Sequence, residues 1–485
     1  MGIVQNQAFK NTIITYFGFG IGAINVLFLY TEFLTPEYFG LITFILSTAN
    51  IMMPLMAFGV HNAIIKFYSS FKTKNKQNSF LTLMLFLPLT VIIPFGLVGY
   101  LSFDVISTWL SKENIIIKDY TWLIFISAIA FAYFEVFYSW SKVQLHTVFG
   151  NFMKEVFHRI GITILLVCLY YNYITVNQLI YGIVGVYILR MLIMKLYAYN
   201  IKWPVLKFHK LGNTTEILKY AALIIIAGSV ANIILEIDKF MIGKYIMIEN
   251  VAYYGVAIYI ATVIGVPARS MHQITNPLTA KLLNEKNNVE LKSLYQKSSL
   301  NLFIISGIIF VLILANLNQL YTLMPMEYRG GLVIVLVIGL AKLFDNLIGN
   351  NNAILFNSDY YRVVLSFGVV LTLLTVVLNI IFIPRFGIEG AAYATFIAMC
   401  LYNCSKIVFV KYKFKMQPFT INTAKTFVLL LVLIVAFYFW EFSFHPIVNI
   451  ILKSILISLC YVFVVYRFNL SEDITAILNK LLNKR

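Results

Sequence analysis

The sequence predicts an all-α integral membrane protein with about fourteen transmembrane helices. Hydrophobic residues make up 60% of the 485 residues and charged residues only 12%, whereas soluble globular proteins average roughly 45–50% and 25%. The mean hydropathy is +0.84. Apolar runs of about 20 residues, enough to cross about 30 Å of hydrocarbon, recur along the whole chain. The loops between them are too short to hold a separate soluble catalytic domain.

The apolar runs define the spans that we expect. The first run follows a polar stretch without a small-residue cleavage site, so we expect no cleavable signal peptide and a retained first span. The expected spans cover residues 9–32, 38–60, 80–103, 119–140, 155–172, 178–199, 216–240, 251–271, 297–317, 330–350, 361–383, 388–410, 423–442 and 447–467.

The basic residues predict the orientation, because Lys and Arg in short loops stay on the cytoplasmic side. If both termini are cytoplasmic, most of the 37 basic residues lie in cytoplasmic loops or within the spans. The loops predicted outside carry only Lys112, Lys118, Lys244, Arg329 and Arg385. Basic cytoplasmic loops face anionic lipid headgroups, which accounts for the net charge of +17. We therefore expect membrane lipids, and not nucleic acid, as partners.

Several motifs of enzymes are missing from the sequence. There is no Walker A motif for ATP hydrolysis, and the six His residues form no zinc-binding pattern. All four cysteines lie inside expected spans, so we expect no disulfides. We predict that the protein is not an enzyme and has no catalytic residues, no cofactor and no metal.

The chain contains a candidate internal repeat. EYFGLITFILSTANIMMP (37–54) resembles AYYGVAIYIATVIGVP (252–267), and both segments run from an outer loop into an even-numbered span. The similarity predicts two parallel six-helix lobes that frame a site between them. The alternative is that an aromatic-aromatic-Gly step recurs by chance at helix starts. The predicted parts are an N-lobe (1–200), a C-lobe (201–415), two further helices (416–467) and a cytoplasmic amphipathic helix (468–485) with Ser471 as N-cap.

Three motifs give the chain a resemblance to a known family. FLTPEYFG (33–40) with FGVHNAIIKFYS (58–69), EIDKFMIGKY (236–245) and IPRFGIEGAAYAT (383–395) resemble the polysaccharide-exporter branch of the MOP superfamily, the Wzx-type O-antigen or lipid-linked oligosaccharide flippases. The resemblance covers almost the whole chain. It implies a MATE-like, V-shaped pair of bundles in the bacterial inner membrane.

The resemblance also implies a function. Such a flippase moves undecaprenyl-diphosphate-linked oligosaccharide from the cytoplasmic to the periplasmic leaflet by alternating access, driven by an ion gradient. The product serves O-antigen, capsule or exopolysaccharide synthesis, with polysaccharide polymerase machinery as a further partner.

A diphosphate inside a membrane needs buried cations, and the Arg fork is best suited to phosphate oxygens. Arg159, Arg190 and Arg269 lie in expected spans five, six and eight, and Lys342 lies in span ten. These four are our candidates for the substrate cavity. Each Arg is also near a cytoplasmic span end, where its side chain could instead extend to the interface.

Carboxylates inside spans are candidates for ion coupling. Glu135 has no partner in its own helix, so it is either an ion relay or bound to a neighbouring span. Asp345 lies one turn after Lys342, which permits either a structural pair or ion coupling.

The charges near the outer end of span seven predict a gate. Asp238 lies near the periplasmic rim, and Glu236 and Lys239 are spaced as a local pair. Together with Gly243 and Pro267, they are our candidates for the gate or hinge.

Two other functions fit parts of the sequence. A MATE-like cation-coupled exporter of small molecules would share the twelve-helix core. A membrane polysaccharide polymerase or glycosyltransferase would need a long outer loop with paired acidic or His residues, and the longest outer loop (102–118) offers only Asp104 and Glu113.

Overall fold

Helices form the regular structure of the described chain, as the sequence predicts. The computed structural model describes residues 2–207 and 211–482, and the elements in these ranges are helices. The side chains of residues 2–6, 8–9, 226–232, 235, 361 and 481–482 are outside the description. Because long apolar helices recur throughout, the protein is a multi-pass membrane protein.

The chain divides into two compact units, Met1–Gly255 and Val256–Arg485. In the structure, residues 201–255 belong with the first unit. The lobes predicted at 1–200 and 201–415 stay a prediction.

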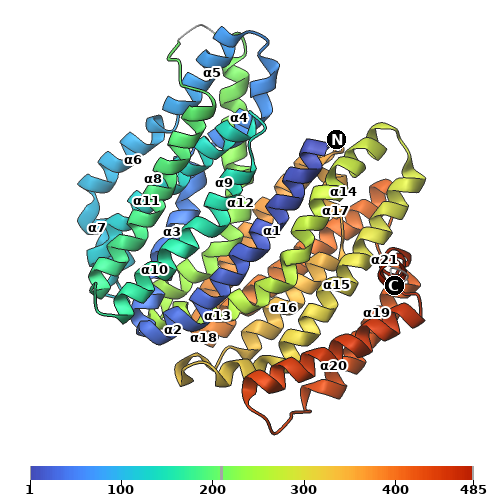
Figure 1. The fold of residues 1–485 in the computed structure, drawn as a ribbon. Coiled ribbons are helices and arrows are strands. Elements are labelled where there is room, and N and C mark those ends of the chain that lie inside the picture. Colours follow the sequence, from blue (N-terminus) through green and yellow to red (C-terminus); the bar gives the residue numbers. More distant parts are fainter. Residues whose placement is uncertain (1, 208–210, 483–485) are drawn as a thin grey trace. The chain divides into compact units, whose positions relative to one another are not determined.

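The first unit is built around two long helices, α8 and α3. Helix α8 packs against α3, α4 and α11, and α3 also packs against α12, while α1 lies along α9 and η3 (Figure 1). The elements are α1 (Gly2–Ile24), η1 (Asn25–Leu29), α2 (Tyr30–Phe33), α3 (Pro36–Met56), α4 (Val60–Phe67), η2 (Tyr68–Ser70), α5 (Lys74–Phe86), α6 (Leu89–Leu101), α7 (Phe103–Leu110), α8 (Ile117–Lys142), α9 (Val148–Phe152), η3 (Met153–Phe157), α10 (His158–Tyr170), α11 (Val176–Ile201), α12 (Thr214–Tyr245) and α13 (Glu249–Thr262), which crosses into the second unit.

The second unit is built around α15, which packs against α14, α16, α19 and α20 (Figure 1). Helix α18 packs against α16 and α17. The elements are η4 (Val263–Gly265), α14 (Val266–Asn284), α15 (Asn288–Thr322), η5 (Met326–Tyr328), α16 (Leu332–Leu347), α17 (Asn351–Phe356), α18 (Tyr361–Phe414), α19 (Ile421–Tyr438), α20 (Pro446–Arg467) and α21 (Glu472–Leu482).

A sharp turn divides α18 at Gly387. This residue has φ 60° and ψ −138°, a conformation that favours glycine. A Cβ added to Gly390 would meet the carbonyl group of Phe382, although eight residues of straight helix would separate the two by about 12 Å. The turn that the sequence predicts between spans eleven and twelve is therefore present.

Every predicted span overlaps helical structure, although some helices begin or end several residues from the predicted bounds. Among the described residues, ten helices are long and apolar enough to cross a membrane. Helix α18 counts once although it covers two predicted spans, and α16 has only 16 residues. The predicted number of fourteen therefore stays a prediction. The outer loop predicted at residues 102–118 contains a short helix, α7.

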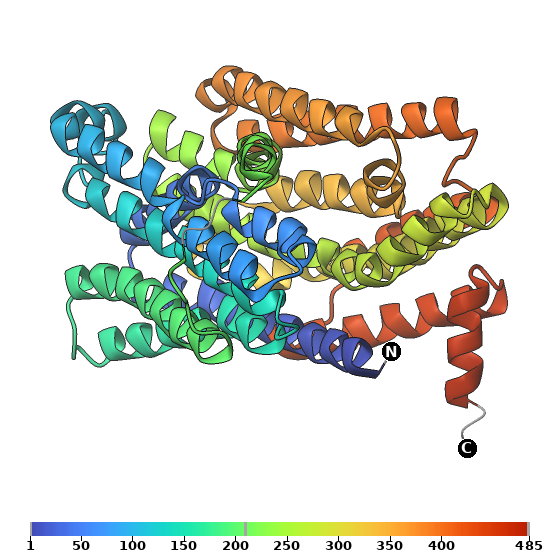
Figure 2. The same cartoon turned by 90° about the horizontal axis from the view of Figure 1, so that it is seen from above.

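The C-terminal helix begins where the sequence predicts. The backbone N–H of Ile474 donates to Oγ of Ser471, which is the N-cap. Asn301 in α15 donates to Asp473 and accepts a hydrogen bond from Ser471. Helix α21 leads to the C-terminus at a steep angle to α20 (Figure 2). Its predicted place on the cytoplasmic membrane surface stays a prediction.

The two glycines of the candidate repeat differ in their packing, which gives a test of the fold. A Cβ on Gly40 would overlap the carbonyl oxygen of Ile248, whereas a Cβ on Gly255 would lie 3.7 Å from Cγ2 of Thr43. We expect Gly40→Ala to destabilise the protein by about 1–3 kcal/mol, because the backbone must shift. Gly255→Ala is the matched control and should unfold at the wild-type temperature. Thermal unfolding in detergent measures both, and equal midpoints for the two variants would contradict the packing.

Candidate functional site

Arg190 in α11 is a buried cation of the first unit, with 7% of its surface exposed. Its guanidinium carbon lies 4.2 Å from the ring centroid of Phe134 and 4.8 Å from that of Tyr187. Aromatic faces attract a cation, but they accept no strong hydrogen bonds. The Nε atom is buried and has no hydrogen-bond partner among the described residues. The Nε–H group of Arg190 is therefore available to donate a hydrogen bond to an anion.

Arg159 lies in the first turn of α10. Its Nη2 is 3.8 Å from Oε2 of Glu155, and its guanidinium carbon is 5.7 Å from the ring centroid of Phe19. Nη1 is buried without a hydrogen-bond partner within the described chain. Arg159 is therefore only partly neutralised and has a further unused donor.

His158 and Tyr187 bring the two arginines into one region. The rings of His158 and Tyr187 stack with centroids 5.4 Å apart. Both Arg159 and Arg190 are close enough to His158 to interact with it electrostatically. We call Arg159, Arg190, His158 and Tyr187 the arginine cluster.

Two π-helical turns flank the arginine cluster. The turn η3 ends directly before His158, and η1 begins at Asn25. The side-chain amide of Asn25 donates to the carbonyl oxygen of Arg159 (2.9 Å), and Thr163 donates to Oδ1 of Asn25 (2.7 Å). These bonds hold α10 against η1. Single π-turns frequently occur at functional sites.

Acidic side chains lie near the cluster, but Glu135 pairs with Lys154 and Glu236 pairs with Lys239. Glu155 pairs loosely with Arg159, and Glu135 and Glu236 lie within electrostatic range of Arg190 and Tyr187 respectively. No carboxylate forms an ion pair with Arg190 in the part of the chain that the structure describes. We therefore predict that the cluster binds an oxyanion through the buried N–H groups of Arg190 and Arg159.

Glu135, a candidate for ion coupling, has a partner on another element. Its Oε1 lies 2.6 Å from Nζ of Lys154 in η3, and 13% of its side chain is exposed. Lys142 and His61 are within electrostatic range. Of the two alternatives from the sequence, the structure contains the contact with a neighbouring helix. A role in ion coupling stays a prediction.

The gate candidates are packed at the end of α12. Oδ2 of Asp238, which is 4% exposed, accepts a hydrogen bond from Tyr254 (2.6 Å). Glu236 and Lys239 form the expected pair at 2.8 Å. A Cβ on Gly243 would lie 2.6 Å from Cδ2 of Phe44 in α3, so glycine permits the close approach of these helices. Their role as a gate is untested.

Three candidates lie around the start of α14 in the second unit. Pro267 is buried in the first turn of α14, directly after the 3₁₀ turn η4. Arg269, two residues later, is exposed. Lys342 in α16 is half-buried, and its Cδ would lie 3.8 Å from a Cβ on Gly265. The substrate roles of Arg269 and Lys342 and the hinge role of Pro267 stay predictions.

Asp345 belongs to a polar group formed by four helices. It is close enough to Lys406 in α18 and His272 in α14 to interact electrostatically. Lys406 is fully buried, donates to Oδ1 of Asn352 in α17 (3.1 Å) and lies 4.0 Å from the ring centroid of Tyr402. The sequence offered only Lys342 as a counter-charge for Asp345.

The sequence interpretation did not include several of these residues. Lys406 lies within the predicted span 388–410 and is not among the candidates, and neither are His158, Tyr187 and Asn25. Two local signals were available: His158 precedes Arg159, and Tyr187 lies one turn before Arg190. The contact of Lys406 with Asn352 has no such signal, because the residues are 54 positions apart.

The comparisons with known proteins agree with the resemblance found in the sequence. The family model described as polysaccharide biosynthesis protein matches residues 4–283, more than half of the chain. No curated protein sequence matches.

Solved structures share the fold at low sequence identity. The lipid II flippase MurJ in an inward closed conformation has a TM-score of 0.74 at 15% identity, over 95% of this chain and 99% of that chain. An inward-facing multidrug resistance MATE family transporter of the MOP superfamily has a TM-score of 0.60 at 14% identity, over 86% and 95%. For the Vibrio cholerae MATE transporter VcmN in the bent form, the TM-score is 0.56 at 13% identity, over 86% and 98%. The expected MATE-like fold class is confirmed.

The unused donors of the arginine cluster predict anion binding. We expect inorganic pyrophosphate to raise the unfolding midpoint of the purified protein by on the order of 2 °C at constant ionic strength. Arg190→Met should remove this response without lowering stability in the absence of anion, because burying a cation is costly. Lys195→Met, on the same helix and only partly buried, should keep the response. An undiminished shift in Arg190→Met would argue against the site.

Proposed function

Because the chain belongs to the polysaccharide biosynthesis protein family, we propose that it is a flippase for a lipid-linked oligosaccharide. The substrate would be an undecaprenyl-diphosphate-linked repeat unit for O-antigen, capsule or exopolysaccharide synthesis. The unit would cross the bacterial inner membrane from the cytoplasmic to the periplasmic leaflet. The likeness in fold to a lipid II flippase supports this substrate class.

The observation that carries the proposal is the arginine cluster. A flippase must replace the water around the diphosphate with its own polar groups while the prenyl chain remains in lipid. Arg190 and Arg159 have buried N–H groups without partners among the described residues, and guanidinium forks match phosphate oxygens. Arg269 and Lys342 are further candidate cations for the substrate.

Transport would proceed by alternating access between two parallel lobes, with both termini cytoplasmic. Asp238, Glu236 and Lys239 would hold the outer gate, and Gly243 and Pro267 would serve as hinge positions. The polysaccharide polymerase machinery would take up the product. The abundance of basic residues in the loops assigned to the cytoplasm supports this orientation.

Analysis of lipid-linked intermediates in a deletion strain tests the function. We expect completed repeat units to accumulate on the cytoplasmic face, and the wild-type gene to restore surface polysaccharide. A double variant, Arg159→Met with Arg190→Met, should lower export by about 10–100-fold, because charged hydrogen bonds to the diphosphate are lost. Lys195→Met should complement fully. Normal export in the deletion strain would end the proposal.

Ion coupling through Glu135 is a separate prediction. In proteoliposomes that contain the full chain, an imposed proton or sodium gradient should accelerate flipping by the wild type. Glu135→Gln, which removes the carboxylate charge but keeps its size, should flip at the rate measured without a gradient. Glu290→Gln, at an exposed position in α15, is the control and should respond as the wild type does. If Glu135→Gln retains the wild-type response, coupling lies elsewhere, and Asp345→Asn becomes the variant to test.

A small-molecule exporter is the second candidate function, favoured by the likeness in fold to a MATE family transporter. It predicts that deletion changes sensitivity to toxic cations and leaves lipid-linked intermediates unchanged. A polymerase or glycosyltransferase has less support, because the solved structures that share the fold are a flippase and transporters.

A further inference from the structure

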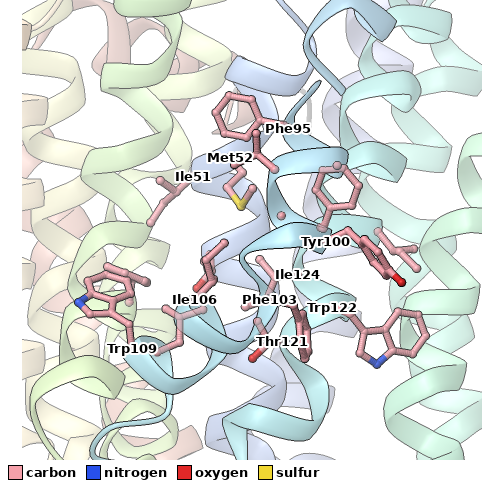
Figure 3. Close-up of a pocket in the computed structure, with 18 of the residues that line it drawn as sticks. Ile51, Met52, Phe95, Tyr100, Phe103, Ile106, Trp109, Thr121, Trp122 and Ile124 are labelled. Carbon is pink, nitrogen blue, oxygen red and sulfur yellow. The ribbon is translucent and has the colours of Figure 1, made fainter. Parts of the chain in front are cut away.

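An apolar pocket of about 730 Å³ lies in the first unit and shares no lining residue with the arginine cluster. Helices α3, α6, α7, α8 and α12 form its walls. Figure 3 shows Ile51 and Met52 on one side, with Ile106 and Trp109 below them and Tyr100 and Trp122 opposite. The lining is almost entirely hydrocarbon, so the pocket suits an apolar ligand.

The pocket is open at α6, which lies within an apolar helical segment long enough to cross a membrane, Lys74–Leu101. Tyr100, Val98 and Trp109 line it and are 81%, 59% and 55% exposed. Exposed apolar side chains on a membrane-spanning helix contact lipid, and aromatic residues gather near the interface. A hydrocarbon chain can therefore enter from the bilayer.

A cation lies at the rim of the pocket. Nζ of Lys244 is 4.1 Å from the ring centroid of Trp109 and donates to its carbonyl oxygen. Lys112 and Glu113 are within electrostatic range of Lys244. An ammonium group has three donors, and this contact uses one of them. The rim can therefore bind an anionic headgroup.

Hydrogen bonds fix the rim in place. The side chain of Asn114 donates to the carbonyl oxygens of Gly243 (2.8 Å) and Ile246 (2.9 Å) and accepts from the backbone N–H of Ile248 (2.8 Å). These bonds tie the connection between α7 and α8 to the end of α12. Trp109 and Lys244 are thereby held side by side.

We propose that this pocket binds a hydrocarbon chain of an anionic phospholipid whose phosphate lies beside Lys244. The lining residues on α6 extend from Phe95 to Tyr100, about 8 Å of helix, which suits part of an acyl chain and is short for a long polyprenyl chain. In the predicted orientation, Lys244 faces the extracytoplasmic side, so the lipid comes from the outer leaflet. The inference concerns a bilayer lipid and does not depend on the transported substrate.

Tryptophan fluorescence reports on the pocket directly, because Trp109 and Trp122 line it. The full chain is reconstituted in phosphatidylcholine vesicles that contain a small fraction of phosphatidylglycerol brominated in its acyl chains. We expect the apparent affinity for this quencher to be about fivefold higher than for brominated phosphatidylcholine. The reason is that one lysine beside an anionic headgroup strengthens binding by about this factor. Replacing Trp109 and Trp122 by Phe should remove the excess quenching.

Matched variants separate pocket binding from general contact with lipid. A Cβ on Gly99, which lines the pocket, meets no atom within 4 Å, so we expect the side chain of Gly99→Leu to extend into the pocket. Gly185 in α11 also has no atom within 4 Å of its Cβ and does not line the pocket. Gly99→Leu should abolish the excess quenching, and Gly185→Leu should keep it. Lys244→Gln should leave the pocket open, but the two brominated lipids should then quench the fluorescence equally.

Three results would overturn the proposal. The first is equal quenching of the wild type by both brominated lipids, and the second is excess quenching that survives in Gly99→Leu. The third is displacement of the brominated lipid by undecaprenyl phosphate but not by unlabelled phosphatidylglycerol, which would assign the pocket to a polyprenyl chain.

Discussion

The cost of placing charge in hydrocarbon governs how the polar side chains of this protein are arranged. Lys453 in α20 is 1% exposed, and its Nζ donates to the carbonyl oxygen of Ala315 in α15 at 2.6 Å. Similarly, Nζ of Lys406 donates to the side-chain oxygen of Asn352 in α17. In both cases the charge is stabilised by a neighbouring helix, so the requirement to satisfy it also fixes which helices lie together. Arg190 is different, since aromatic rings enclose it and one donor remains unused.

The positions of the helices could be predicted from the sequence because they depend on local information. Each span needs about 20 apolar residues, and a glycine that follows proline and arginine marks the turn in α18. The pair formed by Glu236 and Lys239 could also be predicted from the sequence, since residues three apart share a helix face.

Contacts between helices could not be predicted in this way. Periodicity identifies the apolar face of a helix but not the helix that covers it. The aromatic surroundings of Arg190 require that α8 packs against α11, and the contact of Asn25 with Arg159 joins segments 134 residues apart. The π-turns η1 and η3 have no composition signal that distinguishes them from ordinary helix. The interhelical contacts of the candidate site therefore became visible only in the structure.

The turn at Gly387 has a mechanical consequence. A loop of several residues can absorb a displacement by changing its own dihedral angles, but here one non-helical residue joins two long helical segments. At this end the two segments can therefore separate only as far as the dihedral angles of Gly387 allow. The second segment carries Tyr402 and Lys406, so this short connection also limits where those two side chains can lie within the second unit.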